Sequence, residues 1–228
     1  MISDNLSKIR EQIADAAARS GRNPSEIKLL AVSKHIDISK IKEAYEYGQL
    51  LFGENYVQEA REKIDQLEKS ISWHFIGHLQ SNKAKLAAQL FQMIETVDRF
   101  KIAQVLNTHA AELGKTLDIL LQLNIGQEKQ KSGVDPQDAK QFLSKLRGLE
   151  NLRVRGLMIM PPFFIDSEKT RPYFRALKKM ADRFQEQGYF ADNASVVLSM
   201  GMSNDFTVAI EEGSTQVRVG TAIFGKRT

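Results

Sequence analysis

Short apolar runs alternate with longer amphipathic stretches along most of this chain. A continuous apolar run such as residues 29–32 is typical of a strand that is buried on both faces. Segments of this kind predict eight strands, at residues 28–33, 50–53, 72–77, 93–97, 118–125, 153–160, 195–201 and 216–220.

The segments between these runs repeat their apolar positions at the spacing of an α-helix. They predict helices within residues 38–48, 56–69, 99–114, 136–148 and 170–188. Before the first strand, apolar residues recur at Leu6, Ile9 and Ile13. This recurrence predicts an extra N-terminal helix at about residues 3–20, which Gly21 ends.

The regular alternation of strands and helices indicates an α/β fold with a parallel sheet. Eight strands in 228 residues suit a single (β/α)8 TIM barrel, which typically takes about 250 residues. The main alternative is a doubly wound open sheet, but the glycine-rich dinucleotide fingerprint is missing after the first strand. Because the chain shows no linker or internal repeat, we predict one domain over residues 1–228.

Composition narrows the classes of function. The chain has no cysteine, which excludes disulfide scaffolds and thiolate zinc sites, and no metal site is predicted. No apolar stretch approaches the length of a membrane helix, and the first residues lack the apolar core of a signal peptide. The net charge of +4 is spread among acidic residues, so nucleic-acid binding is not expected. We expect a cytoplasmic protein without a membrane partner.

Polar side chains follow most of the predicted strands. In a (β/α)8 barrel the functional residues lie at these carboxyl-terminal strand ends. Any single Asn or Asp among them is better explained by a turn or a helix cap. Their convergence on one rim is what makes the set informative: Lys34, Glu54, Asn55, His78, Asp98, Asn124, Ser199, Arg218 and Thr221.

Lys34 directly follows the first predicted strand, residues 28–33. Taken alone, it is either a solvated surface residue or a nucleophile held in a pocket. The loops after strands seven and eight, "LSMGMSND" and "RVGTAIFG", favour the second interpretation. They combine glycines with hydroxyls, including Ser199 and Ser203, at the usual phosphate site of this barrel, and Ser203 is a good N-cap for the helix that follows. Ordinary glycine turns with a capping serine are the alternative.

A phosphate site opposite a strand-end lysine predicts a phosphorylated aldehyde bound as a Schiff base, and pyridoxal 5'-phosphate (PLP) is the obvious candidate. Arg218 lies beside the phosphate loop and could donate to the pyridine nitrogen. Because arginine stays charged, that nitrogen would remain unprotonated and the cofactor would be a poor electron sink.

The motifs "LLAVSK", "FGENYVQEA", "WHFIGHLQSNK", "KSG", "GLMIM", "LSMGMSNDF" and "STQVRVGTAIFG" resemble the YggS/PROSC family of PLP homeostasis proteins, from about residue 5 to residue 226. The resemblance implies a barrel like the N-terminal domain of alanine racemase, with PLP bound covalently to Lys34. It also implies phosphate ligands from Ser199, Gly220 and Thr221, a pyridine contact from Arg218 and a pocket wall from Asn55. Arg99 departs from the family pattern, which more often has a small residue there.

Three functions fit these residues. The resemblance favours a carrier of PLP without catalytic residues, which would serve PLP-accepting apo-enzymes. A PLP-dependent amino-acid racemase is the alternative, but it needs a second base, and Tyr56 is the one tyrosine that follows a pocket motif. A phosphosugar-binding barrel would leave Lys34 unexplained. A monomer is expected, because no heptad pattern indicates an interface.

The loop "GQEKQKSGV" adds one further hypothesis. Lys131 lies in it, on the same predicted rim as Lys34. A solvated charged loop is one interpretation. The other is a looser anion site that steers PLP in or out of the pocket.

Overall fold

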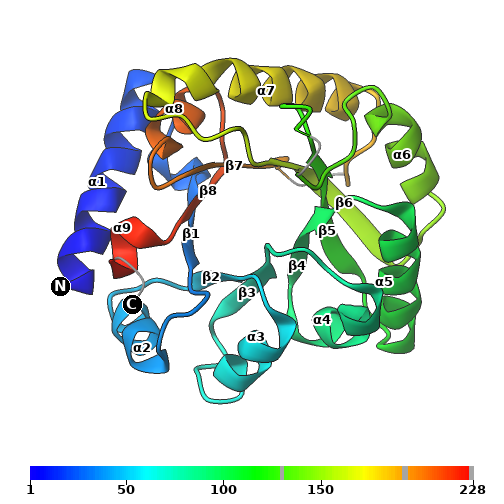
Figure 1. Cartoon of the computed structure of the whole chain (residues 1–228), viewed down its shortest axis with the longest axis horizontal. Helices are drawn as coiled ribbons and strands as arrows, with labels where there is room; N and C mark the ends of the chain where they lie inside the picture. Colours follow the sequence, from blue (N-terminus) through cyan, green and yellow to red (C-terminus); the bar gives the residue numbers. More distant parts are fainter. Residues whose placement is uncertain (129–130, 192–194, 226–228) are drawn as a thin grey trace.

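Eight parallel strands close into a barrel in the computed structural model, which describes residues 1–128, 131–191 and 195–225 (Figure 1). The strands are β1 (Lys28–Val32), β2 (Leu51–Glu54), β3 (Ser72–Phe75), β4 (Met93–Val97), β5 (Leu117–Leu123), β6 (Leu152–Ile159), β7 (Val197–Met202) and β8 (Gln216–Val219). Each strand pairs with the next along the chain. β8 closes the barrel on β1, with Ala31 opposite Val219. The predicted (β/α)8 fold and its eight strands are therefore confirmed.

Helices surround the barrel (Figure 1). They are α1 (Ile2–Arg19), α2 (Ile38–Glu46), α3 (Val57–Ile64), α4 (Ala84–Leu90), α5 (Phe100–Glu112), α6 (Ala139–Leu146), α7 (Arg171–Glu186), α8 (Phe206–Glu211) and α9 (Thr221–Phe224), with short 3-10 turns η1 (Pro24–Glu26), η2 (Ser81–Lys83) and η3 (Ser167–Thr170). α4 and α9 were not predicted, because their lengths of seven and four residues give too little periodicity.

No helix in the described ranges is long and apolar enough to cross a bilayer.

The N-terminal helix α1 lies outside the strand–helix repeat and packs against α8 and α9. Leu6, Ile9 and Ile13 form its buried face, as their spacing predicts. Two polar contacts fix its position: the Asn5 amide donates to the Ile223 carbonyl at 2.8 Å, and Arg19 pairs with Glu211 at 2.9 Å. α1 therefore packs the N-terminal segment against the C-terminal helices α8 and α9 on one side of the barrel.

Alternate residues of the strands face outward and inward. Outward-facing aromatic residues pack under the helices, for example Phe52 against Trp73, whose ring centroids lie 5.5 Å apart. The interior of the barrel is different, because it holds buried polar side chains from β4, β7 and β8. This polar interior lies directly beneath the rim that the sequence marks as functional.

Candidate functional site

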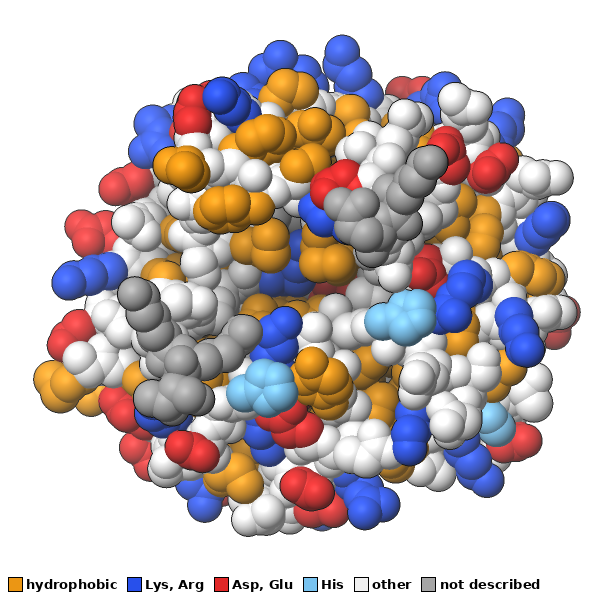
Figure 2. All heavy atoms as spheres, viewed as in Figure 1, with side chains coloured by type: hydrophobic (Ala, Val, Ile, Leu, Met, Phe, Trp, Pro, Cys, Tyr) orange, Lys and Arg blue, Asp and Glu red, His pale blue; other side chains and the backbone are white. Residues whose placement is uncertain are grey.

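A pocket of about 270 Å³ opens at the carboxyl-terminal ends of β1, β2, β6, β7 and β8. Figure 2 shows a hollow at the centre of this face, ringed by hydrophobic side chains, with Lys or Arg side chains at its floor and edge. Five of the six site residues predicted from the sequence line the pocket: Lys34, Asn55, Arg218, Gly220 and Thr221. Segments far apart in the chain therefore meet at one point, as the barrel topology requires.

The segment that carries Lys34 is anchored on both sides. The ammonium of Lys63 donates to the Ser33 carbonyl at 2.6 Å, and Glu59 accepts from the backbone N–H of His35 at 2.5 Å. His35 has a positive φ of 58°, a conformation that needs such support outside glycine. Lys34 itself is half-buried between these two anchored neighbours. Its position in the pocket is therefore set by the backbone on either side.

The anchor is a buried ion-pair cluster from β2 and α3. Lys63 contacts the carboxylates of Glu54 at 2.8 Å and Glu59 at 2.6 Å. Burial raises the pKa of Glu54 above its usual range, although Lys63 opposes this shift. Burial acts in the same direction on Glu59, but the hydrogen bonds from Lys63 and the His35 N–H outweigh it and lower the pKa of Glu59. Because Glu54 directly precedes Asn55, the cluster also holds the second strand end of the pocket.

Asn55 presents an unused acceptor to the site. Its side-chain oxygen Oδ1 is buried and has no hydrogen-bond partner among the described residues. A buried polar atom without a partner is unfavourable by about 1–3 kcal/mol. A ligand that donates a hydrogen bond at this point would remove that penalty.

Ser199 is the predicted site residue that the pocket does not include. It is fully buried inside the barrel, where its hydroxyl donates to Glu95 at 2.5 Å and accepts from Arg218 at 2.7 Å. Both capacities of the hydroxyl are thereby used within the protein. The expectation that Ser199 contacts phosphate is therefore corrected: it supports Arg218 from below.

Arg218 is one end of a buried network of hydrogen-bonded side chains that extends through the barrel. Glu95 lies at its centre and accepts from His74 Nδ1 at 2.7 Å and from Gln216 Nε2 at 2.7 Å, in addition to Ser199. Burial would raise the pKa of Glu95, but the bond from His74 and the charge of Arg218 hold this pKa below its usual range. Burial lowers the pKa of Arg218, opposed by the charge of Glu95. Because its ordinary pKa is so high, the guanidinium stays charged.

The loop after β7 brings Ser203 to the pocket in place of Ser199. Gly201 has a φ of +92°, and a Cβ there would lie 2.6 Å from the Cβ of Ala209. This turn therefore needs glycine, and it places Ser203 on the pocket wall. The prediction that Ser203 is the N-cap of α8 was wrong, because Asp205 occupies that position and accepts from the Met202 N–H at 2.7 Å.

The hydroxyls of Ser203 and Thr221 make no hydrogen bond within the part of the chain that the structure describes. The first N–H groups of α9, at Thr221 and the residue after it, have no partner inside their own helix. This side of the pocket therefore offers donors to an anion.

Other polar strand ends do not reach the pocket. His78 contacts Arg99 at 3.1 Å, and Arg99 also donates to the Leu79 carbonyl at 2.8 Å. Asn124 instead orders its own loop by donating to the Glu128 carbonyl at 2.9 Å. Arg99 therefore belongs to the rim beyond the pocket.

Lys131 lies near the rim without lining the pocket. Its ammonium contacts Glu128 at 2.6 Å and donates to the Pro161 carbonyl at 2.9 Å. Lys129, from the same basic loop, lies outside the described residues. The contact to Pro161 connects Lys131 to the loop after β6, whose Pro162 and Phe163 form a pocket wall.

Sequence reasoning missed the carboxylates near Arg218. Glu95 stands in the middle of the apolar strand "MIETV", and a carboxylate in such a run must have a buried cationic partner. That single charge was the signal that could have identified it. Asp205 gave no comparable signal, because it lies in an ordinary polar turn. Burial raises the pKa of Asp205, which lines the pocket beside Arg218.

Residues 5–228 match the family described as alanine racemase, N-terminal domain. The sequence is 42% identical to the pyridoxal phosphate homeostasis protein of Haemophilus influenzae, over 99% of this chain and 96% of that protein. It is 43% identical to the protein of the same name from Escherichia coli K12, over 99% of this chain and 97% of that protein.

Solved structures agree with these matches. The structure of PipY from Synechococcus elongatus with PLP bound is 36% identical, with a TM-score of 0.87 over 99% of this chain and 100% of PipY. An alanine racemase of Clostridium difficile is 17% identical, with a TM-score of 0.77 over 98% of this chain and 57% of the racemase. At this low identity the racemase shows a shared fold alone.

Proposed function

The chain belongs to the family of pyridoxal phosphate homeostasis proteins, which have the alanine racemase N-terminal domain fold, and from this membership we propose that it binds and carries PLP. The observation that carries the proposal is the pocket itself. It brings Lys34, Arg218 and the donors around Thr221 together at one rim. PipY, a relative 36% identical to this chain, has been solved with PLP bound.

The chemistry of the pocket residues fits this cofactor. When bound, PLP supplies an aldehyde that condenses with a lysine amine to form an imine, with loss of water. Lys34 is the amine on the pocket wall that we assign to this bond. Ser203, Gly220 and Thr221 would hold the phosphate, and Arg218 would donate to the pyridine nitrogen. The unpaired Oδ1 of Asn55 would accept a hydrogen bond from the ligand.

The composition of the pocket favours a carrier over a racemase. A racemase needs acid/base groups on both faces of the substrate carbon. Besides Lys34, the ionisable side chains among the described lining residues are Arg218, which remains charged, and Asp205, which is buried and accepts a backbone N–H. Tyr56 is 52% exposed and contacts the His35 ring instead of lining the pocket. Among the described residues that line the pocket, none is therefore placed to act as a second base.

The covalent bond to Lys34 is tested by reduction with borohydride. PLP-loaded protein is reduced and digested, and the pyridoxyl group is located by peptide mapping. We expect it on Lys34, and we expect the Lys34→Ala variant to lose the absorbance of the imine near the visible edge while it stays folded. The matched control is Lys40→Ala, which changes an exposed lysine of α2. A label mainly on a lysine other than Lys34 would contradict the assignment.

The remaining parts of the proposal concern partners. A carrier would release PLP to apo-enzymes, which is tested by the recovery of activity of a PLP-free aminotransferase mixed with the loaded protein. We propose a monomer in the cytoplasm, to be tested by sedimentation equilibrium and by cell fractionation. Measurable interconversion of L- and D-alanine by pure protein would instead favour the racemase.

A further inference from the structure

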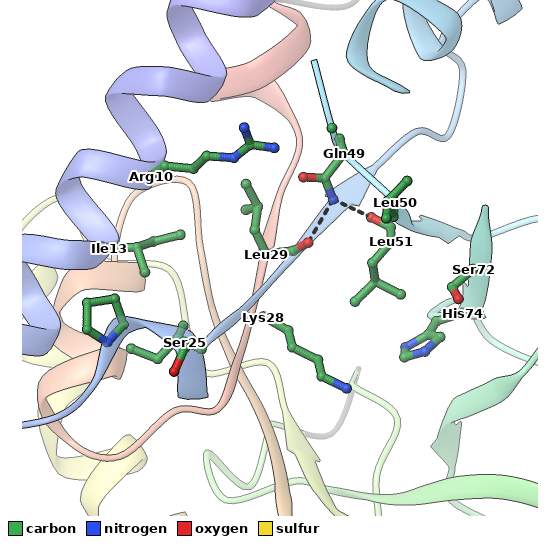
Figure 3. A pocket seen from close by; sticks show the side chains of 13 residues that line it. Arg10, Ile13, Ser25, Lys28, Leu29, Gln49, Leu50, Leu51, Ser72 and His74 are labelled. Atoms are coloured by element: carbon green, nitrogen blue, oxygen red, sulfur yellow. Dashed lines mark hydrogen bonds between the residues drawn. The ribbon is translucent and has the colours of Figure 1, made fainter. Parts of the chain in front are cut away.

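A second and larger cleft lies at the opposite end of the barrel. It has a volume of about 590 Å³ and is bounded by α1, η1 and the segments that begin β1, β2 and β3 (Figure 3). Lys28 begins β1 at this end, whereas Lys34 follows the same strand at the other end. Six residues at about 3.3 Å per residue separate the two lysines by about 20 Å. The cleft is therefore distinct from the pocket assigned to PLP.

The ionisable side chains that line this cleft are all basic. They are Arg10 from α1, Lys28 from β1 and His74 from β3, and no Asp or Glu is among the described lining residues. Figure 3 shows the side chain of Lys28 extending into the cleft toward His74. The Arg10 guanidinium donates to the Tyr47 carbonyl at 3.0 Å, which keeps it at the edge of the cleft. The electrostatic character of the site thus favours an anion.

Lys28 is the cation best placed to receive a ligand. In the described ranges its ammonium has neither an ion-pair partner nor a hydrogen bond, unlike the ammonium of Lys63 in the buried ion-pair cluster of β2 and α3. His74 is fixed in orientation by its bond to Glu95, which engages Nδ1 and leaves Nε2 available to a ligand. Ser25 and Ser72 add hydroxyls to the lining.

Apolar side chains complete the cleft. Ile13 and Leu29 lie on one side of it, and Leu50 and Leu51 lie on the other (Figure 3). Leu50 is 51% exposed, so it offers apolar surface that the fold itself leaves uncovered. The Gln49 amide bridges the Leu29 and Leu51 carbonyls at 2.8 Å and 2.7 Å, which holds the two walls at a fixed separation.

We propose that this cleft binds a small organic oxyanion, a carboxylate or phosphate attached to an apolar body. Lys28 is the principal charged contact, with His74 at the floor and Arg10 at the edge. The apolar body lies against the leucine and isoleucine side chains. The site is separate from the PLP pocket, and its occupant need not be a form of vitamin B6.

The single tryptophan of the chain provides a fluorescence signal for binding in the cleft. Trp73 lies on β3 between Ser72 and His74, both of which line the cleft. Phenyl phosphate and benzoate are titrated while tryptophan fluorescence is recorded, with benzyl alcohol as the uncharged probe. The two anions distinguish a phosphate ligand from a carboxylate ligand. We expect saturable binding of at least one anion and none of benzyl alcohol.

Lys28→Gln removes the charge and keeps most of the side-chain volume. We expect it to weaken anion binding roughly tenfold, as for loss of a hydrogen bond to a charged group. The matched control is Lys101→Gln on α5, an exposed lysine on a helix that does not border the cleft. Circular dichroism melting establishes that both variants are folded.

The outcome is decided by two comparisons. Equal affinity of Lys28→Gln and Lys101→Gln, or binding of benzyl alcohol as tight as that of the anions, would overturn the proposal. The titration is repeated on protein whose PLP has been fixed by borohydride reduction and from which free PLP has been removed. Anion binding that is lost in this protein would place the ligand in the other pocket and would also refute the proposal. Because PLP binding itself is judged from the Lys34 experiment, failure here leaves the proposed function separately testable.

Discussion

Replacing Glu95 with glutamine tests whether this carboxylate holds Arg218 at the floor of the pocket. Glu95 is fully buried and accepts hydrogen bonds from His74, Ser199 and Gln216. Glutamine has nearly the same shape but carries one acceptor oxygen and an NH2 group. Its NH2 group would face donors, and the charge that compensates Arg218 would be lost.

The magnitude follows from burial. Removing one partner of a buried charge pair costs about 3–5 kcal/mol, because the remaining charge is left uncompensated. In a chain of this size each kcal/mol lowers Tm by about 2–4 °C. We therefore expect Glu95→Gln to lower Tm by roughly 6–20 °C at neutral pH. We also expect PLP to bind roughly tenfold more weakly, because Arg218 is no longer held in place.

The pH dependence has a definite sign. The pKa of Glu95 is lower in the folded protein than its ordinary value of 4.5. A depressed carboxyl pKa contributes stability above the ordinary value, and this contribution is lost as the pH falls toward the folded pKa. The stability difference between the native protein and Glu95→Gln should therefore be full at neutral pH and should shrink as the pH falls below 4.5.

Urea unfolding at a series of pH values measures this difference, and PLP titration measures the effect on the pocket. The control is Glu62→Gln, which removes an exposed carboxylate of α3. If Glu95→Gln were as stable as this control and bound PLP as tightly as the native protein, the carboxylate would not be what positions Arg218. A stability difference that stayed constant down to acid pH would refute the assigned ionisation of Glu95.

Two further predictions concern the rim. Ser203→Ala and Thr221→Ala should each weaken the binding of PLP roughly tenfold and that of pyridoxal much less, because the phosphate alone uses these hydroxyls. Equal weakening of the two affinities in equilibrium titrations would show that the phosphate does not bind on this side of the pocket. Lys131→Ala should change the rates of PLP loading and release in stopped-flow absorbance at low salt without altering the spectrum of bound PLP, because it frees the loop at Pro161. Rates equal to those of the native protein would assign Lys131 to the surface alone.

The architecture could be predicted because the barrel repeats a simple pattern. Eight apolar runs separated by amphipathic segments fit few folds, and each predicted strand overlaps an observed one. The rim position of Lys34 and Thr221 followed from topology, since parallel strands all end on the same side. The short helix α4 escaped detection because it spans less than two full repeats of a helical pattern.

The direction of individual side chains was harder to predict. Ser199 lies within β7 and Ser203 directly follows it, and both carry hydroxyls suited to phosphate. The turn at Gly201 separates them, so that Ser199 faces the interior and Ser203 faces the pocket. Sequence alone does not reveal which side of such a turn a residue occupies. The cleft at Lys28 was equally hidden, because Arg10 and His74 reach it from elements far apart in the chain.

The polar interior of the barrel is best understood through the pocket above it. Burying charges is unfavourable, and well-packed apolar residues in place of a buried ion pair are often neutral or stabilising. Stability alone therefore does not explain why β4, β7 and β8 contribute Glu95, Ser199 and Arg218 where most such barrels place branched apolar residues. Arg218 lines the pocket and stays charged, so its burial requires a compensating buried anion. Glu95 supplies that anion, and Ser199 links the two by donating to one and accepting from the other. The buried network thus compensates the charge of Arg218, the residue that we propose as the donor to the ligand at the floor of the pocket.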